Sequence, residues 1–182
     1  MGIPNLLTFL RIILIPVFIL LFYLPFRGSH VLAAIIFIFA AMTDWLDGYL
    51  ARSLGQVSKL GTFLDPVADK LIVVTALVLL VGDRVLPYLA IPAIVIICRE
   101  IMVSALREWM AEIGKRTRIA VTRKRKIKTT VQMLALILLL LYKPGAWFAL
   151  ALSGYLLLYL AALLTLWSMS LYLKAAWRDL SS

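Results

Sequence analysis

Four aspartates stand close together in a chain that is otherwise nearly free of acidic residues. Of the nine acidic residues in the sequence, four are Asp44, Asp47, Asp65 and Asp69. Residues three or four positions apart lie on one face of a helix, so each neighbouring pair is expected to point the same way. The first pair lies near the end of one predicted helix and the second near the start of the next. If a short turn joins these helices, the two pairs can meet.

Carboxylates that converge at a nearly dry site repel one another unless cations compensate their charge. Oxygen ligands without histidine or cysteine favour hard divalent ions such as Mg²⁺ or Mn²⁺. The lone His30 and the lone Cys98 cannot build a zinc site. The alternative is that the aspartates cap helices or pair with Arg52, Lys59 and Lys70 at a membrane surface. Capping explains one or two aspartates, and not four with glycines interleaved.

The composition indicates a membrane protein. Hydrophobic residues make up 64% of the chain and the mean hydropathy is +1.01, whereas soluble domains are about half apolar. The formal net charge of +10 does not indicate a nucleic-acid partner, because the cations are interleaved with segments that lipid would bury. Anionic lipid headgroups and phosphate-bearing substrates fit this charge better. One cysteine excludes an intrachain disulfide.

Six apolar runs predict an all-α integral membrane protein, a bundle of six transmembrane helices. Each run approaches the roughly twenty residues that a bilayer requires, the fifth being the shortest. Asn5 or Thr8 is expected to cap the first helix. No repeat, low-complexity tract or linker divides the chain, so residues 1–182 are predicted to form a single domain. The predicted spans are residues 6–26, 31–50, 59 or 61 to 81, 86 to 106 or beyond, 127–141 and 147–173.

Charge predicts the orientation of these spans. Six spans place both termini on one side of the membrane. The segment 107–128 carries nine Lys and Arg residues, and the loop after the second span adds Arg52 and Lys59, whereas the alternate loops carry only Arg27, Arg84 and Lys143. By the positive-inside rule, the basic loops, both termini and the aspartate cluster are cytoplasmic.

The aspartates belong to a longer pattern of fixed spacing. Eight residues are fixed over twenty-six positions, which makes this pattern far more specific than a short motif. It reads Asp44-x-x-Asp47-Gly48-x-x-Ala51-Arg52, then an eight-residue gap, then Gly61-x-x-x-Asp65-x-x-x-Asp69. It resembles the complete motif of the CDP-alcohol phosphotransferases, integral membrane enzymes of phospholipid synthesis. Four further stretches resemble the bacterial members that make phosphatidylglycerophosphate: Pro4-Asn5-Leu6-Leu7-Thr8-x-x-Arg11, Arg99-Glu100-Ile101, Ser104-Ala105-Leu106-Arg107-Glu108-Trp109 and Lys126-x-Lys128-Thr129-Thr130-x-Gln132.

The resemblance implies transfer of the phosphatidyl group from CDP-diacylglycerol to glycerol 3-phosphate, giving phosphatidylglycerophosphate and CMP, in the inner membrane of a bacterium. A homodimer is implied by the family alone. Asp69 would accept the proton of the attacking hydroxyl. Two Mg²⁺ or Mn²⁺ ions would be held by Asp44, Asp47, Asp65 and Asp69. CDP-diacylglycerol would contact Asn5, Thr8, Asp44, Gly48, Ala51, Arg52 and Gly61.

Small residues beside the aspartates leave room for a ligand. Gly48, Ala51 and Gly61 remove side-chain bulk, which suits the close approach of a pyrophosphate and its metals. The alternative for small residues in membrane helices is close helix packing.

An acceptor that itself carries a phosphate needs cations apart from the metals. Arg99 and Arg107 are eight residues apart, hence roughly on one helix face, and Lys126 and Lys128 start the next span. Arg99 stands within an apolar run, so it should face the protein interior, paired with Glu100 or an aspartate. For Arg107 the alternative is a surface charge that only sets membrane orientation.

Two other functions are compatible with these residues. One is the same chemistry with a different alcohol acceptor, such as inositol phosphate. The other is a divalent-cation transporter, although transport sites normally lie near the bilayer midplane and these aspartates lie at helix ends. Metal-dependent release of CMP from CDP-diacylglycerol would separate the enzyme from the transporter.

Overall fold

A computed structural model describes residues 3–26, 28–54, 59–83, 86–112, 123–142 and 148–180 of the chain. Within these ranges it describes the side chains except at residues 3–5, 44, 45, 47–54, 59, 60, 62, 63, 65, 66, 107, 111, 123–126 and 171–180. The described residues are almost all helical and none lies in a strand, which confirms the all-α prediction. The helices are α1 (Ile3–Tyr23), α2 (Ser29–Leu54), α3 (Lys59–Gly82), α4 (Ala90–Glu112), α5 (Arg123–Leu141) and α6 (Phe148–Leu180).

Helix α1 begins earlier than expected. Because α1 starts at Ile3, Asn5 and Thr8 both lie inside the helix, and the prediction that one of them caps it is wrong. Pro4 suits the first turn of a helix, where an amide hydrogen would have no partner within the helix. Neither Asn5 nor Thr8 therefore occupies the N-cap position of α1.

The turn before α4 also differs from the prediction. The apolar run predicts a helix from about residue 86, but α4 begins at Ala90. Pro87 and Tyr88 form a turn, in which Tyr88 has a φ of 64°. Two hydroxyls of α6 hold it: Tyr155 donates to the carbonyl oxygen of Pro87 at 2.6 Å, and Tyr159 donates to that of Tyr88 at 2.8 Å. These contacts with α6, which hydropathy does not report, stabilise the turn.

Three helices extend beyond the apolar runs that predict them. Helix α2 continues to Leu54, α5 begins at Arg123, and α6 continues to Leu180. The added turns are rich in Arg, Lys, Leu and Ala, which have high helix propensity although some of them are charged. Hydropathy therefore underestimates the length of these helices.

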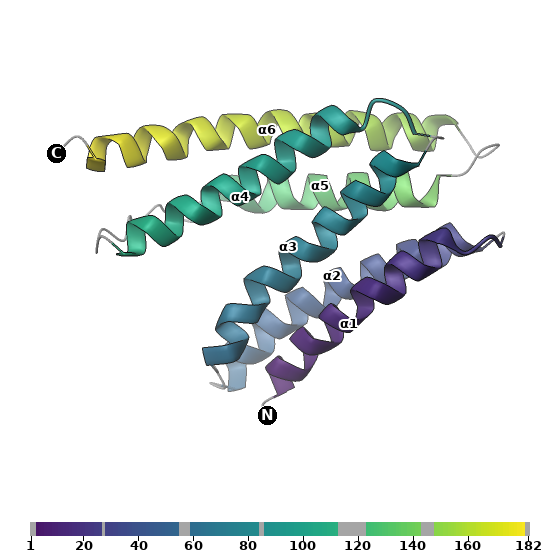
Figure 1. Cartoon of the computed structure of the whole chain (residues 1–182), viewed down its shortest axis with the longest axis horizontal. Helices are drawn as coiled ribbons and strands as arrows, with labels where there is room; N and C mark the ends of the chain where they lie inside the picture. Colours follow the sequence, from purple (N-terminus) through teal and green to yellow (C-terminus); the bar gives the residue numbers. More distant parts are fainter. Residues whose placement is uncertain are drawn as a thin grey trace.

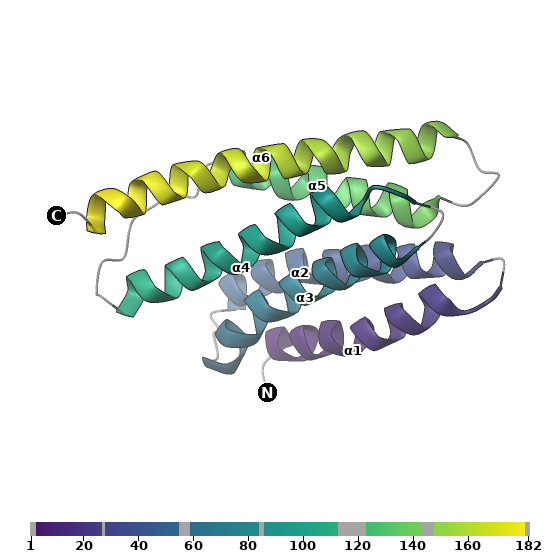
Figure 2. The same ribbon diagram turned by 45° about the horizontal axis from the view of Figure 1, so that its top comes forward.

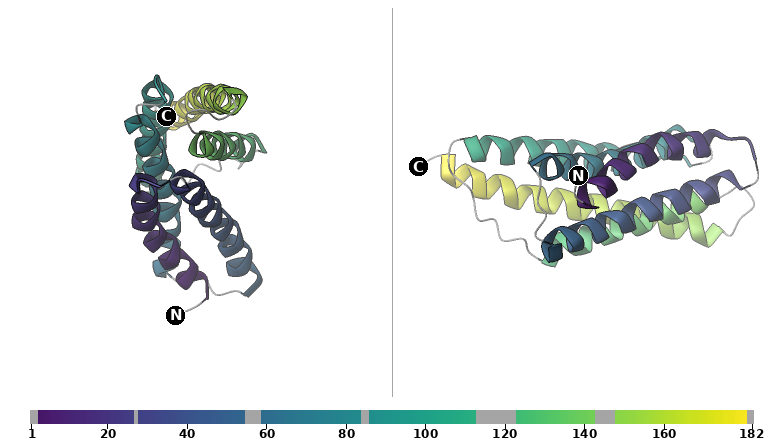
Figure 3. Two further views of the ribbon diagram at one scale, coloured as in Figure 1. Left: turned by 90° about the vertical axis from the view of Figure 1, so that its right-hand side faces the viewer. Right: turned by 90° about the horizontal axis from the view of Figure 1, so that it is seen from below.

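The six helices run alternately up and down along the long axis of the molecule (Figures 1 and 2). The starts of α1, α3 and α5 and the ends of α2, α4 and α6 lie toward one end of the molecule (Figure 1). Helix α1 packs most extensively on α2, and α5 on α6. Contacts of α2 with α5, and of α3 with α4 and α5, join the first three helices to the last three (Figure 3).

One cluster of buried side chains draws on every helix. The aromatic rings of Phe18 and Phe37 lie 6.0 Å apart between α1 and α2. Such a shared core holds the helices in one arrangement through close van der Waals packing of their side chains. The assignment of residues 1–182 to one domain stays a prediction. The remaining helices contribute, among others, Leu80, Ile96, Leu136, Leu139 and Leu158.

The outside of the helices is also apolar. Soluble monomers rarely expose large continuous apolar surfaces, so this exterior is typical of a protein that faces lipid. By length and composition, two stretches of the described helices can cross a membrane, Leu6–Tyr23 and Phe148–Ser170, while the apolar stretches Ser29–Thr43 and Ile127–Leu141 are shorter. The count of six spans therefore stays a prediction. Apolar side chains that are more than half exposed include Ile13, Leu20, Ile35, Val78, Ile91, Ile94, Leu156 and Leu163.

The close packing of α5 and α6 depends on Gly154. A Cβ at this position would lie 2.8 Å from Cγ of the buried Leu139. We expect Gly154→Ala to lower the thermal unfolding temperature in detergent, because overpacking costs about 1–3 kcal/mol and exceeds the helix-propensity gain of up to about 1 kcal/mol. Gly82→Ala is the matched control, since a Cβ there meets nothing within 4 Å. Equal unfolding temperatures for the two variants would contradict the packing argument.

Candidate active site

The first aspartate pair lies in the second half of α2. Asp44, Asp47, Gly48 and Ala51 occupy positions i, i+3, i+4 and i+7 of this helix. Their positions therefore share one face of α2. Because α2 continues to Leu54, the whole of this part of the motif is helical.

The second aspartate pair lies near the start of α3. Gly61, Asp65 and Asp69 recur every four residues, so their positions also share one helix face. Gly61 is buried and Asp69 is half-buried, while Ala68 next to it is fully buried. Helices α2 and α3 pack together. The fold thus brings both aspartate pairs to the end of the molecule where α1 begins (Figure 1).

Much of the predicted donor site lies outside the side chains that the structure describes. Thr8 is described: it is fully buried in α1, which packs against α2 and α3. Among the described residues, no three His, Cys, Asp or Glu side chains gather as metal ligands. The side chains of three of the four aspartates lie outside the described ones, so the metal site stays a prediction. The residues of the predicted donor and metal sites whose side chains are not described are Asn5, Asp44, Asp47, Gly48, Ala51, Arg52 and Asp65.

The residues present nevertheless fit hard divalent ions. Two packed helices carry four carboxylates within a single motif, and these offer oxygen atoms only. Cys98, the chain's one thiol, is exposed on α4. Mg²⁺ and Mn²⁺ match this chemistry, and Asp44, Asp47, Asp65 and Asp69 are the residues that would hold them.

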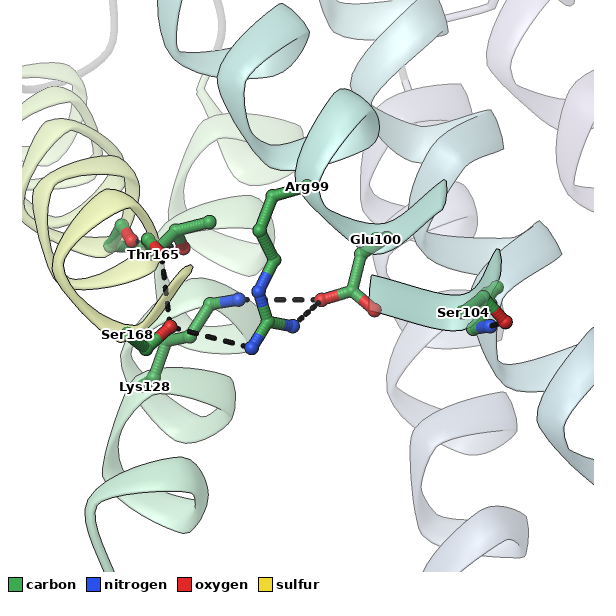
Figure 4. A network of polar contacts seen from close by, with 8 residues as sticks. Arg99, Glu100, Ser104, Lys128, Thr165 and Ser168 are labelled. Atoms are coloured by element: carbon green, nitrogen blue, oxygen red, sulfur yellow. Dashed lines mark hydrogen bonds and ion pairs between the residues drawn. The ribbon is translucent and has the colours of Figure 1, made fainter. Parts of the chain in front are cut away.

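A cluster of charged side chains lies inside the other half of the molecule. Arg99 of α4 is 3% exposed, although it stands in an apolar helix. Its Nη1 donates to Oε1 of Glu100 at 2.6 Å, and its Nη2 donates to Oγ of Ser168 on α6 at 3.3 Å. The prediction that Arg99 faces the interior and pairs with Glu100 is confirmed (Figure 4).

Lys128 of α5 joins the same cluster. It is 5% exposed, and its Nζ lies 3.3 Å from Oε1 of Glu100. The structure thus brings together two of the four cations that the sequence proposes for acceptor binding, with one carboxylate oxygen between them (Figure 4). The side chains of Arg107 and Lys126, the other two, lie outside the described ones.

Sequence reasoning missed Ser168 and the contact between Lys70 and Ser104. Ser168 contacts Arg99, and its own hydroxyl donates to the carbonyl oxygen of Thr165 at 2.9 Å. Lys70, the residue after Asp69, donates from Nζ to Oγ of Ser104 on α4. The Lys70–Ser104 contact links the aspartate-bearing α3 to the helix that carries Arg99. Ser104 belongs to a stretch that resembles the family, but its spacing does not identify Lys70 as its partner.

These features define an all-helical protein in which an acidic motif on α2 and α3 is linked to a buried cationic cluster on α4, α5 and α6. The sequence model of the CDP-alcohol phosphatidyltransferases matches residues 1–167. The chain belongs to this family.

Named relatives match over nearly the full length of the chain. A CDP-diacylglycerol--glycerol-3-phosphate 3-phosphatidyltransferase of Pseudomonas fluorescens is 56% identical, covering 100% of this chain and 93% of the relative. Proteins of the same name from Yersinia enterocolitica and Salmonella paratyphi A are each 52% identical; they cover 99% and 98% of this chain, and 97% of each relative is matched.

Proposed function

We propose that the protein transfers the phosphatidyl group of CDP-diacylglycerol to glycerol 3-phosphate, forming phosphatidylglycerophosphate and CMP. The observation that carries this proposal is the match with transferases of that name, more than half identical over nearly the whole chain. Their shared name also favours glycerol 3-phosphate over inositol phosphate as the acceptor. The product would supply the synthesis of anionic phospholipids.

The donor end of the site is assigned to the motif on α2 and α3. Asp69 takes the proton of the acceptor hydroxyl while the hydroxyl oxygen bonds to the phosphorus that carries the diacylglycerol. The bond from that phosphorus to the CMP oxygen breaks in the same displacement. When bound, two divalent ions neutralise the pyrophosphate and stabilise the departing oxygen. The nucleotide lipid is bound by Asn5, Thr8, Asp44, Gly48, Ala51, Arg52 and Gly61, among which Arg52 compensates phosphate charge.

The acceptor end is assigned to the cationic cluster. Arg99 and Lys128 bind the phosphate of glycerol 3-phosphate, with Arg107 and Lys126 as further cations. Support comes from the burial of Arg99 and Lys128 and from their convergence on one point between helices. A buried site that already holds two cations suits a doubly charged phosphate.

The membrane arrangement is part of the proposal. All six helices cross the inner membrane, with both termini and the aspartate motif on the cytoplasmic side. The alternating direction of the helices, the apolar exterior and the basic segment 107–128 support this orientation. The functional unit is a homodimer.

The acceptor assignment predicts a selective loss. Arg99→Gln and Lys128→Gln should each raise the Michaelis constant for glycerol 3-phosphate by roughly ten- to a hundredfold, because a charge-assisted contact contributes about 1.5–3 kcal/mol. The Michaelis constant for CDP-diacylglycerol and the metal dependence should not change. CMP release in detergent measures both constants.

Glycerol, which lacks the phosphate, provides the internal comparison. The wild type should use it very poorly, and the two variants should lose little further activity toward it. Lys143→Gln is the matched control, because Lys143 follows the opposite end of α5. If Arg99→Gln and Lys128→Gln instead raise the Michaelis constant for CDP-diacylglycerol, these cations bind the donor and not the acceptor. An absence of CMP release by the wild type would favour the transporter.

A further inference from the structure

Glu100 is the centre of the cationic cluster. Its Oε1 accepts a hydrogen bond from Arg99 at 2.6 Å and another from Lys128 at 3.3 Å. The side chains of Arg99 and Lys128 are only 4% and 6% exposed, whereas that of Glu100 is 27% exposed. A single carboxylate oxygen of Glu100 therefore binds two buried cations from two helices. The Glu100 side chain itself is partly exposed.

Glu100 bridges two cations whose helices, α4 and α5, do not pack against each other along their described residues. Over the described residues, α4 and α5 each pack against α6 but make no close backbone contact with one another. Long charged side chains thus meet between α4 and α5, and the Glu100–Lys128 pair connects them (Figure 4). Without a negative charge between them, two buried cations repel, and burial opposes the charge of each.

Ser168 provides a second support from α6. The Ser168 hydroxyl donates to the carbonyl oxygen of Thr165, so its oxygen is turned to accept from Nη2 of Arg99. The guanidinium of Arg99 is therefore fixed on two edges, by Glu100 on α4 and by Ser168 on α6. Such fixation lowers the entropy that a bound ligand must remove from the side chain.

We propose that Glu100 is a positioning residue for the acceptor: it holds the side chains of Arg99 and Lys128 together until the acceptor phosphate binds. The inference rests on the proposed function, because it takes these cations as the phosphate site. An incoming phosphate brings the negative charge that Glu100 otherwise supplies, and the more exposed carboxylate can then turn outward. A neutral alcohol cannot make this exchange, so Glu100 also contributes to selection of a phosphorylated acceptor.

The test separates the charge of Glu100 from its shape. Glu100→Gln should raise the Michaelis constant for glycerol 3-phosphate about tenfold, with the constant for CDP-diacylglycerol unchanged, because the amide removes the charge and keeps the size. Glu100→Asp, which retains the charge, should return the acceptor constant to within about threefold of the wild type. Ser168→Ala should raise it about threefold. Ser170→Ala is the matched control, since Ser170 is exposed and its hydroxyl donates to the carbonyl oxygen of Trp167 in its own helix.

A double substitution keeps the test decisive if Glu100→Gln does not fold. Glu100→Gln/Lys128→Gln removes one buried cation together with the carboxylate, and Lys128→Gln alone is its reference. Because Glu100 acts through the cations, the double variant should differ from that reference by no more than about threefold in the acceptor constant. Three results would overturn the inference. The first is a tenfold difference in the acceptor Michaelis constant between the double variant and Lys128→Gln, and the second is an unchanged or lowered acceptor constant in Glu100→Gln. The third is an equal acceptor constant in Glu100→Asp and Glu100→Gln. Failure of the wild type to release CMP with glycerol 3-phosphate would instead overturn the proposed function.

Discussion

Asp69→Asn should reduce turnover by several orders of magnitude while the protein still folds. The substitution removes both a base and a charged ligand, yet it hardly changes the side-chain volume. Asp69 is half-buried on α3, which limits access of bulk water as a substitute base. Single-turnover release of CMP from CDP-diacylglycerol in the presence of glycerol 3-phosphate measures the loss.

Asp83→Asn is the matched control for this variant. Asp83 follows the opposite end of α3, about 20 Å from Asp69 along the helix. It lies outside the motif, so CMP release should stay at the wild-type rate, and both variants should have the wild-type unfolding temperature. Turnover near the wild-type rate in Asp69→Asn would remove Asp69 from the chemistry.

Arg99 illustrates what the sequence can predict. A guanidinium within an apolar run is costly in lipid, so it must turn inward and find a charged partner. The structure confirms both the burial of Arg99 and its pairing with Glu100. The helical spacing of the aspartates was equally readable, because α2 and α3 cover those positions without interruption. The roles of these residues in binding stay predictions.

Other features depend on tertiary packing and leave no pattern in the sequence. A helical serine can bond to the backbone of its own helix, so its type alone does not reveal that Ser168 also contacts Arg99. Likewise, the turn at Tyr88 lies in an apolar run and is held by hydroxyls from α6. Lys70 looks like a partner for aspartates, yet it donates to Ser104 across the α3–α4 contact.

Removal of divalent metal should abolish CMP release. The motif contains four carboxylates, and without cations their mutual repulsion opposes the approach of an anionic pyrophosphate. Activity should return with Mg²⁺ or Mn²⁺. Ca²⁺ should restore it poorly, because its longer and more variable coordination misplaces the reacting oxygens. Titration of metal into chelator-treated protein, with CMP release as the readout, measures this dependence.

The shared core predicts that removal of the metal leaves the fold intact, so the inactivity reflects the missing ions. Apolar side chains from all six helices form one cluster, and their van der Waals packing does not require a metal. We therefore expect the chelator-treated protein to unfold cooperatively in detergent and to regain full activity when Mg²⁺ is added. The Lys143→Gln control should show the same metal dependence as the wild type. Undiminished CMP release in excess chelator would exclude a metal-dependent displacement and leave the four aspartates without their proposed role.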